Sequence, residues 1–323
     1  MLRMDGFELH NARSYAEALA LWLAAPGAVY VAGGTDLVPN LKHRILRPSR
    51  LVGIGGIAGG VEVGDTEIRI GAGVRLQDIA DSPEIRALVP PLAEAASLVA
   101  GPQIRNMGTL GGNVMLDTRC LYYNQSESWR KALGYCLKAE GTWCHVVGGP
   151  KTCVAAQSSD TVPVLLALDA RLRWLGPTGV SETAIRELYQ FNGMDHLASE
   201  KGALLTDIVV PRPAPGFRGR YLKLRTRDSI DFPQLGLALC GDFDGDVPQS
   251  LQIVVGAANP QPKPVRGLDA FLGRPLDMAA IEAIADLVYK QTRPQAAVNG
   301  DPAWRRQMAS VFTRRGLAAL VAG

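Results

Sequence analysis

Four of the five cysteines in this chain of 323 residues lie between positions 120 and 153, and this cluster constrains the fold more than any other feature. The N-terminal segment carries charges from its third residue on and has no uninterrupted apolar stretch, so it does not resemble a signal peptide. No segment approaches the roughly 18 apolar residues of a membrane-spanning helix. We therefore expect a cytoplasmic protein without a membrane segment. In that reducing compartment, clustered thiols are more often metal ligands or redox groups than structural disulfides.

The spacing of Cys120, Cys136, Cys144 and Cys153 favours an iron–sulfur cluster. Zinc sites usually contain two cysteines separated by two or four residues, and no such pair occurs here. A [4Fe–4S] cluster needs four thiolates and tolerates irregular spacing when a loop wraps around it. Segment 119–153 carries five basic and two acidic residues, a charge that would stabilise an anionic cluster. Structural zinc and redox-active thiols remain as the alternatives.

The composition of the chain indicates a globular protein. It is 47% hydrophobic and 20% charged, with a formal net charge of +3. This balance excludes a disordered chain and argues against a protein whose main role is to coat nucleic acid. The length is sufficient for two or three domains.

The order of the predicted elements indicates an α/β segment, then an antiparallel sheet with helices, and then a smaller α+β tail. Helical periodicity is present in segments 14–23, 75–79, 91–100, 278–291 and 304–321. A hairpin pattern covers 61–74, and strand patterns occupy 28–31, 51–54, 162–175, 203–210, 235–242 and 251–257. A proline-rich run at 211–216 indicates a boundary between units.

Two glycine-rich segments predict a binding site for a long cofactor. The first glycine loop, VAGGTDL at 31–37, follows a predicted strand, and its glycines allow backbone N–H groups to face an anion. The second glycine loop, IRNMGTLGGN at 104–113, adds the hydroxyl of Thr109 and the amide of Asn113. Together they predict a diphosphate-bearing cofactor between subdomains. A third motif, GIGGIA at 53–58, fits a dinucleotide fingerprint but precedes a hairpin pattern where a helix is required, so we do not assign it.

The ordered set of motifs resembles a known family over essentially the whole chain. Beside the two glycine loops, Ser159-Asp160 precedes an apolar run and YLKLR occupies 221–225. Together these resemble the FAD-binding medium subunits of the xanthine dehydrogenase and carbon monoxide dehydrogenase family of molybdenum hydroxylases. The resemblance implies an α+β chain with a two-subdomain FAD-binding fold of the PCMH type. A small C-terminal α+β domain with a three-stranded antiparallel sheet would follow. We expect units at 1–58, 59–212 and 213–323, with an insertion at about 116–156 in the second.

The resemblance also implies which residues contact FAD. In that family the glycine loops hold the FAD pyrophosphate, an aspartate after the second loop contacts the ribose or adenine end, and a lysine lies near the flavin. Carried over to this sequence, the contacts are Val31, Ala32, Gly33, Gly34, Thr35, Asp36, Thr109, Gly112, Asn113, Asp160 and Lys223. The sequence equally allows Asp160 to cap a helix or turn and Lys223 to be an exposed strand residue. No catalytic residue is implied on this chain.

The cysteine segment departs from the family pattern. Asn113 and Asp160 lie 47 positions apart, roughly 38 more than is typical of the family, and the four clustered cysteines fall inside this cysteine insert. A flavin subunit with such an insert resembles the β subunits of 4-hydroxybenzoyl-CoA reductases, which remove a ring hydroxyl reductively in anaerobic aromatic degradation. That resemblance implies a [4Fe–4S] cluster on the four cysteines that passes electrons from a ferredoxin-like donor to FAD.

The cysteine count also implies partner subunits. Only Cys240, expected to be a small buried apolar residue, lies outside the insert, so this chain cannot supply ligands for the two [2Fe–2S] clusters of such an enzyme. The resemblance implies a molybdenum-cofactor subunit and a [2Fe–2S] subunit in a dimer of heterotrimers, without nucleic acid. One alternative is the FAD subunit of an N-heterocycle or aldehyde dehydrogenase that delivers electrons to NAD and holds structural zinc. Another is a non-enzymatic module whose basic insert docks an acidic protein or nucleic acid.

Overall fold

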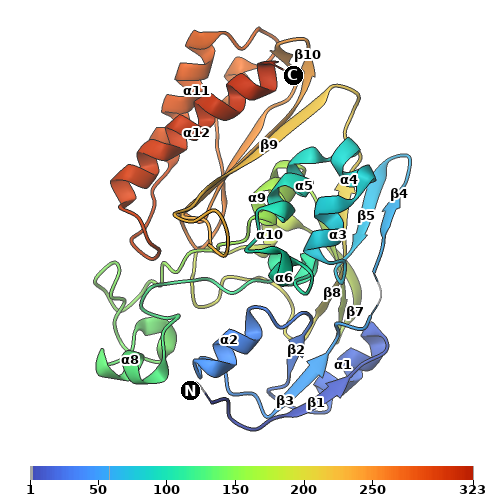
Figure 1. The fold of residues 1–323 in the computed structure, drawn as a ribbon, viewed down its shortest axis with the longest axis vertical. Helices are drawn as coiled ribbons and strands as arrows, with labels where there is room; N and C mark the ends of the chain where they lie inside the picture. Colours follow the sequence, from blue (N-terminus) through green and yellow to red (C-terminus); the bar gives the residue numbers. More distant parts are fainter. Residues whose placement is uncertain (1–2, 58, 323) are drawn as a thin grey trace.

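Three β-sheets make up the framework within residues 3–57 and 59–322, the part of the chain that the computed structural model describes (Figure 1). The first sheet is parallel, with strand order β1-β3-β2. Its helix α1 begins where the sequence predicts, because the Ser14 hydroxyl accepts a hydrogen bond from the Glu17 amide. The elements of this unit are β1 (Glu8–Asn11), α1 (Tyr15–Leu23), β2 (Val29–Val31), α2 (Leu37–Lys42) and β3 (Arg50–Gly53).

The second sheet is antiparallel, with strand order β4-β5-β8-β6-β7, and helices cover one of its faces. The hairpin predicted at 61–74 is confirmed as β4 and β5. The strands are β4 (Val61–Val63), β5 (Glu67–Gly71), β6 (Arg171–Gly176), β7 (Gly179–Ala184) and β8 (Leu204–Pro211). The helices are α3 (Leu76–Asp81), α4 (Pro83–Leu88), α5 (Pro90–Ser97), α6 (Pro102–Arg105), α7 (Leu110–Val114), α9 (Thr161–Ala167) and α10 (Ile185–Leu188).

The third sheet lies between the second unit and two long C-terminal helices (Figure 1). Side chains alternate along β10: Ala238 and Cys240 pack into the core of the second unit, whereas Leu237 and Leu239 pack toward α11 and α12. Cys240 is 2% exposed, which confirms it as a small buried residue. The predicted three-stranded sheet is present as β9 (Phe217–Leu224), β10 (Leu235–Asp244) and β12 (Gln252–Gly256). Short β11 (Val247–Pro248) and β13 (Lys263–Pro264) extend it, and a 3-10 turn, η2 (Leu268–Phe271), leads to α11 (Met278–Gln291) and α12 (Pro302–Ala322).

The cysteine insert is mostly irregular and projects beside helix α2 of the first unit (Figure 1). It contains α8 (Glu127–Ala132) and a 3-10 turn, η1 (Leu137–Ala139). Arg119 and Ala156 exchange two backbone hydrogen bonds of 2.8 Å, which close the insert at its base. The Leu121 amide donates to the carbonyl of Ala297, so the insert also contacts the C-terminal unit.

Most predicted elements are confirmed, and one is wrong. The helix predicted at 278–291 has those bounds in α11. The strand pattern at 162–175 instead begins with helix α9, and only its second half forms β6. Every residue of α9 is buried, so its sequence has no polar face to reveal a helical period, and the β-branched Val162 and Val164 mimic a strand.

In the described part of the unassigned motif GIGGIA at 53–58, no helix follows the strand. Strand β3 ends at Gly53, and the next element that the structure describes is β4. Ala58, the last residue of the motif, lies outside the described residues. A helix N-terminus facing a pyrophosphate, which that fingerprint requires, therefore does not follow it in the described chain.

Candidate functional site

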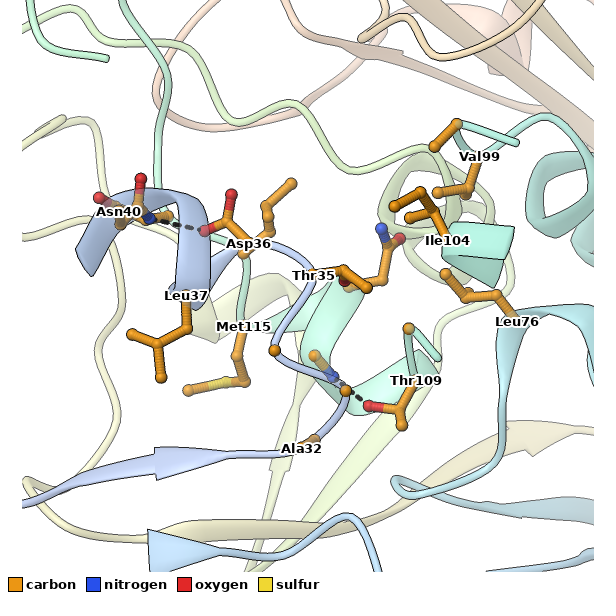
Figure 2. Close-up of a pocket in the computed structure, with 18 of the residues that line it drawn as sticks. Ala32, Thr35, Asp36, Leu37, Asn40, Leu76, Val99, Ile104, Thr109 and Met115 are labelled. Atoms are coloured by element: carbon orange, nitrogen blue, oxygen red, sulfur yellow. Dashed lines mark hydrogen bonds between the residues drawn. The ribbon is translucent and has the colours of Figure 1, made fainter. Parts of the chain in front are cut away.

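A cavity of about 430 Å³ lies where the three units meet (Figure 2). Both glycine loops line it, together with residues of segments 115–117, 158–160 and 230–232. In Figure 2, Leu76, Val99 and Ile104 gather on one side of the first glycine loop, and Leu37 and Asn40 lie on the other. Of the residues predicted to contact FAD, all but Lys223 line this cavity.

The first glycine loop presents a row of free backbone donors to the cavity. Among the described residues, the N–H groups of Gly33, Gly34, Thr35 and Asp36 have no hydrogen-bond acceptor. Gly34 has a φ of +70°, a conformation that favours glycine. Gly33 packs so closely on the second glycine loop that a Cβ there would overlap the backbone carbonyl of Met107. Consecutive free N–H groups in a concave turn suit the oxygens of a phosphate or pyrophosphate.

The second glycine loop differs from the prediction, because its backbone amides are largely engaged within the protein. The amides of Gly108, Leu110 and Gly111 donate to backbone carbonyls at 2.7, 2.9 and 2.8 Å. The amide of Gly112 donates to the Thr109 hydroxyl at 3.1 Å, which caps α7. This loop therefore contributes mainly side chains to the cavity, and few free backbone amides.

Asn113 joins the two ends of the polypeptide that the insert separates. Its side-chain oxygen accepts hydrogen bonds from the Ser159 hydroxyl at 2.6 Å, the Thr161 hydroxyl at 2.7 Å and the Thr161 amide at 3.3 Å. The side-chain nitrogen of Asn113 has no partner within the part of the chain that the structure describes, and the residue lines the cavity. Asn113 therefore has one half committed to the fold and one donor group available to a ligand.

Asp160 and Lys223 form a buried ion pair at the edge of the cavity. The Lys223 ammonium lies 2.9 Å from Asp160 Oδ2 and donates to the Leu98 carbonyl, while the Tyr221 hydroxyl donates to Asp160 Oδ1 at 2.8 Å. The side chains of Lys223 and Asp160 are 1% and 4% exposed. Burial raises the pKa of Asp160, and the Lys223 charge opposes that rise.

The structure brings the two members of this pair into direct contact, which their predicted roles do not require. The family resemblance implies that Asp160 contacts the ribose or adenine end of FAD and that Lys223 lies near the flavin. A direct contact of 2.9 Å places both residues at one point. Lys223 does not line the cavity itself, and its ammonium fixes the carboxylate of Asp160, which does.

Asp36 also has its carboxylate engaged. One oxygen accepts from Asn40 Nδ2 at 3.0 Å and the other lies 2.5 Å from Arg119 Nη1. The Arg119 guanidinium stacks over the ring of Phe232 at 3.8 Å. Asp36 therefore fixes the first glycine loop to the base of the cysteine insert through Arg119, the neighbour of Cys120.

Several cavity residues lie outside the predicted set, among them Ile230, Asp231 and Phe232. These three belong to the loop between β9 and β10, where Ile230 has a φ of +51°. The available signal was the length of this connection, since an antiparallel pair needs only a short turn and a longer loop is often functional.

The four clustered cysteines meet in a second, smaller pocket. All four are free thiols, between 5% and 8% exposed. Apolar, aromatic and polar side chains complete the pocket: Tyr122, Tyr123, Leu137, Lys138, His145, Val146 and Ala155. The folded insert therefore brings together cysteines that are irregularly spaced in the sequence.

Backbone contacts fix the positions of these thiols. The Cys153 carbonyl accepts a hydrogen bond from the Gly193 amide at 2.9 Å, and a Cβ on Gly193 would lie only 2.8 Å from Cys153 Sγ. Cys144 begins a tight turn in which its amide donates to the Gly149 carbonyl at 2.7 Å. Gly193 is thus required as a glycine because the thiol lies against its backbone.

The environment of the thiols disfavours free thiolates. Burial raises the pKa of Cys120 to about 12 and also raises that of Cys153. A backbone N–H of Ala155 and the charge of Lys138 oppose the rise at Cys153. A bound metal lowers the pKa of the thiols that bind it, so a metal centre in this pocket would stabilise the thiolate form. Within residues 3–57 and 59–322, no three His, Cys, Asp or Glu side chains surround one point closely enough for a single metal ion.

Two family profiles match consecutive parts of the chain. One, described as the FAD binding domain in molybdopterin dehydrogenase, matches residues 5–213. The other, described as the CO dehydrogenase flavoprotein C-terminal domain, matches residues 220–320. Together they cover both sides of the cavity.

Individual proteins are similar over nearly the whole length. The aldehyde oxidoreductase FAD-binding subunit PaoB of Escherichia coli is 29% identical over 304 residues, covering 91% of this chain and 92% of the relative. The carbon monoxide dehydrogenase medium chain of Hydrogenophaga pseudoflava is 28% identical over 320 residues, covering 97% and 96%. A solved structure of carbon monoxide dehydrogenase from that organism, lacking the Mo-pyranopterin moiety of the cofactor, aligns with a TM-score of 0.80 at 26% identity and covers 99% of both chains. No helix in the described residues of the present chain is long and apolar enough to cross a membrane.

Proposed function

Because the chain belongs to the family of FAD-binding medium subunits of the molybdenum hydroxylases, we propose that it relays electrons between two redox centres, FAD and a [4Fe–4S] cluster. FAD would occupy the cavity at the meeting point of the three units, and the cluster would occupy the thiol pocket of the cysteine insert. The substrate chemistry of the complete oxidoreductase would take place on another subunit, at molybdenum.

The observation that carries the FAD proposal is the row of free N–H groups from Gly33 to Asp36. These donors would hold the pyrophosphate, and the free amide nitrogen of Asn113 would donate to the same part of the cofactor. FAD exchanges electrons singly or in pairs when bound, so it can accept them one at a time from a one-electron centre. The contact with Lys223 would hold the Asp160 carboxylate at the edge of the cavity, where it could accept a hydrogen bond from the cofactor.

The thiol pocket supports the cluster proposal through its donor set. Four thiolates are the ligands of a [4Fe–4S] cluster, and each binds a different iron, so they surround a volume rather than a point. The four buried free thiols that line one pocket match this set of four donors. A cluster supplies one-electron chemistry when bound.

The 4-hydroxybenzoyl-CoA reductase role extends this proposal to the whole enzyme. A ferredoxin-like donor would deliver single electrons to the insert, and they would continue to FAD. The molybdenum cofactor and the [2Fe–2S] clusters would lie on two partner subunits, in a cytoplasmic dimer of heterotrimers. In this chain, units 1–58, 59–212 and 213–323 would act as the FAD-binding subdomains and the C-terminal domain.

The test is metal and flavin analysis of the full chain purified without oxygen, with EPR after dithionite reduction. We expect about four irons per FAD and the signal of a reduced cluster. Zinc without iron would overturn the cluster and favour an FAD subunit that delivers electrons to NAD. The absence of flavin would overturn the FAD site.

A pair of variants locates the metal. Cys136→Ser should lose iron and keep FAD, because Cys136 lines the thiol pocket and does not line the cavity. The matched control is Cys240→Ala, which changes the cysteine outside the insert and should keep both cofactors. Equal loss of iron and FAD from Cys136→Ser would contradict two separate sites.

A further inference from the structure

Lys138 is a buried lysine that the proposed function does not yet use. It belongs to η1, its side chain is 6% exposed, and it lines the thiol pocket together with all four cysteines. Lysine is rarely buried to this degree unless its charge is paired. Its partners therefore indicate what the residue does.

The partners of Lys138 use its full hydrogen-bonding capacity. The ammonium lies 2.6 Å from Asp117 Oδ1, 2.6 Å from the Thr118 hydroxyl oxygen and 3.1 Å from the Thr118 carbonyl oxygen. The ring centroid of Tyr123 lies 4.5 Å away, within the range of a cation–π contact. Three acceptors match the three N–H groups of an ammonium, so the charge is held at one place.

Asp117 links this cation to the other cofactor site. The residue lines the cavity assigned to FAD, and its side chain is 35% exposed. His196 also approaches the carboxylate, with Nδ1 3.8 Å from Asp117 Oδ1. The pair of Lys138 and Asp117 therefore spans the wall between the two sites, with the cation on the thiol side.

We propose that Lys138 is a positioning residue that raises the reduction potential of the cluster held by the four thiols. This inference rests on the proposed function. Reduction adds one negative charge to a centre that is already anionic, and a fixed cation in a poorly solvated pocket stabilises the reduced form. Lys131, on the exposed surface of α8, is screened by water and should have little influence.

The experiment compares Lys138→Met, Lys138→Arg and the control Lys131→Met in the full chain purified without oxygen. Iron and flavin per chain are measured first, and the cluster is then titrated against potential by EPR. We expect Lys138→Met to lower the equilibrium constant for cluster reduction at least tenfold, which is 59 mV for a one-electron couple. Lys138→Arg and Lys131→Met should stay within threefold of the wild type.

A double variant separates charge from packing. Lys138→Met leaves the Asp117 carboxylate without its cation, and this alone could loosen the insert. Lys138→Met with Asp117→Asn removes both charges, so it should keep its iron and have a potential between those of the wild type and Lys138→Met. Retained iron with an unshifted potential in Lys138→Met would overturn the inference, and so would an equal shift in Lys131→Met. Loss of iron from Lys138→Met and also from the double variant would assign Lys138 to anchoring alone and overturn the inference. A wild type without iron would instead overturn the proposed function itself.

Discussion

Lys223→Met should strongly destabilise the protein, because it leaves Asp160 buried without its cation. The two side chains are 1% and 4% exposed and their charged atoms lie 2.9 Å apart, so water cannot replace the lost partner. Removing one member of a buried pair costs about 3–5 kcal/mol, and we expect a loss in this range in the free energy of unfolding at neutral pH. The measurement is urea unfolding of the flavin-free chain, followed by circular dichroism.

The pH dependence of the stability of Lys223→Met provides an independent test. Burial already raises the pKa of Asp160, and without Lys223 that pKa rises further. The folded variant then binds a proton more readily than the unfolded chain, in which an aspartate has a pKa of about 3.9. The contribution of Asp160 to stability should therefore be fully present below that value and be lost as the pH rises through the raised folded pKa.

Two further variants decide whether this reasoning is correct. Asp160→Asn with Lys223→Met removes both charges and should recover at least about 1 kcal/mol of the loss. Lys290→Met changes an exposed lysine of α11 and should alter stability by less than about 0.5 kcal/mol. If Lys223→Met unfolded at the same urea concentration as Lys290→Met, the pair would contribute nothing and the argument would be refuted.

Three other substitutions test the remaining geometry. Gly33→Ala should weaken FAD binding at least tenfold, since its Cβ would overlap the second glycine loop, and Gly56→Ala, where a Cβ meets open space, is its control in a flavin fluorescence titration. Gly193→Ala should lower iron content while FAD stays bound, because its Cβ would displace the Cys153 thiol; metal analysis showing full iron occupancy would contradict this. Arg305→Met should lower the thermal midpoint markedly and cost about 3 kcal/mol or more, as the buried guanidinium donates to three backbone carbonyls; a melting curve like that of the wild type would show that water replaces it.

The sequence predicts amphipathic elements well and wholly buried ones poorly. Helix α11 has an apolar face in the core that it shares with α12 and the third sheet, and a polar face toward water, so its bounds are visible in the residue pattern. Helix α9 is buried on every side and lacks that signal. The cysteine insert has little periodicity, so its shape could not be derived from the sequence at all.

The site shows a similar division between residue type and position. Glycines after a strand identify the first loop, because few other residues permit such a turn. Which amides stay free depends on partners distant in sequence, as the engaged amides of the second loop show. The contact between Asp160 and Lys223 joins residues 63 positions apart, and no local pattern could place them together.

The paired backbone of Arg119 and Ala156 bears on how such a chain could acquire a second cofactor. Because these two residues are paired, segment 120–155 leaves and rejoins the rest of the chain at one place. Asn113 also accepts hydrogen bonds from Ser159 and Thr161, which hold together the two chain segments on either side of the insert. A segment attached in this way can be gained, lost or exchanged as one cassette, provided that the residues it touches outside itself, such as Gly193 and Ala297, accommodate the change. Such an exchange would alter the segment beside the cavity and keep the architecture that binds FAD.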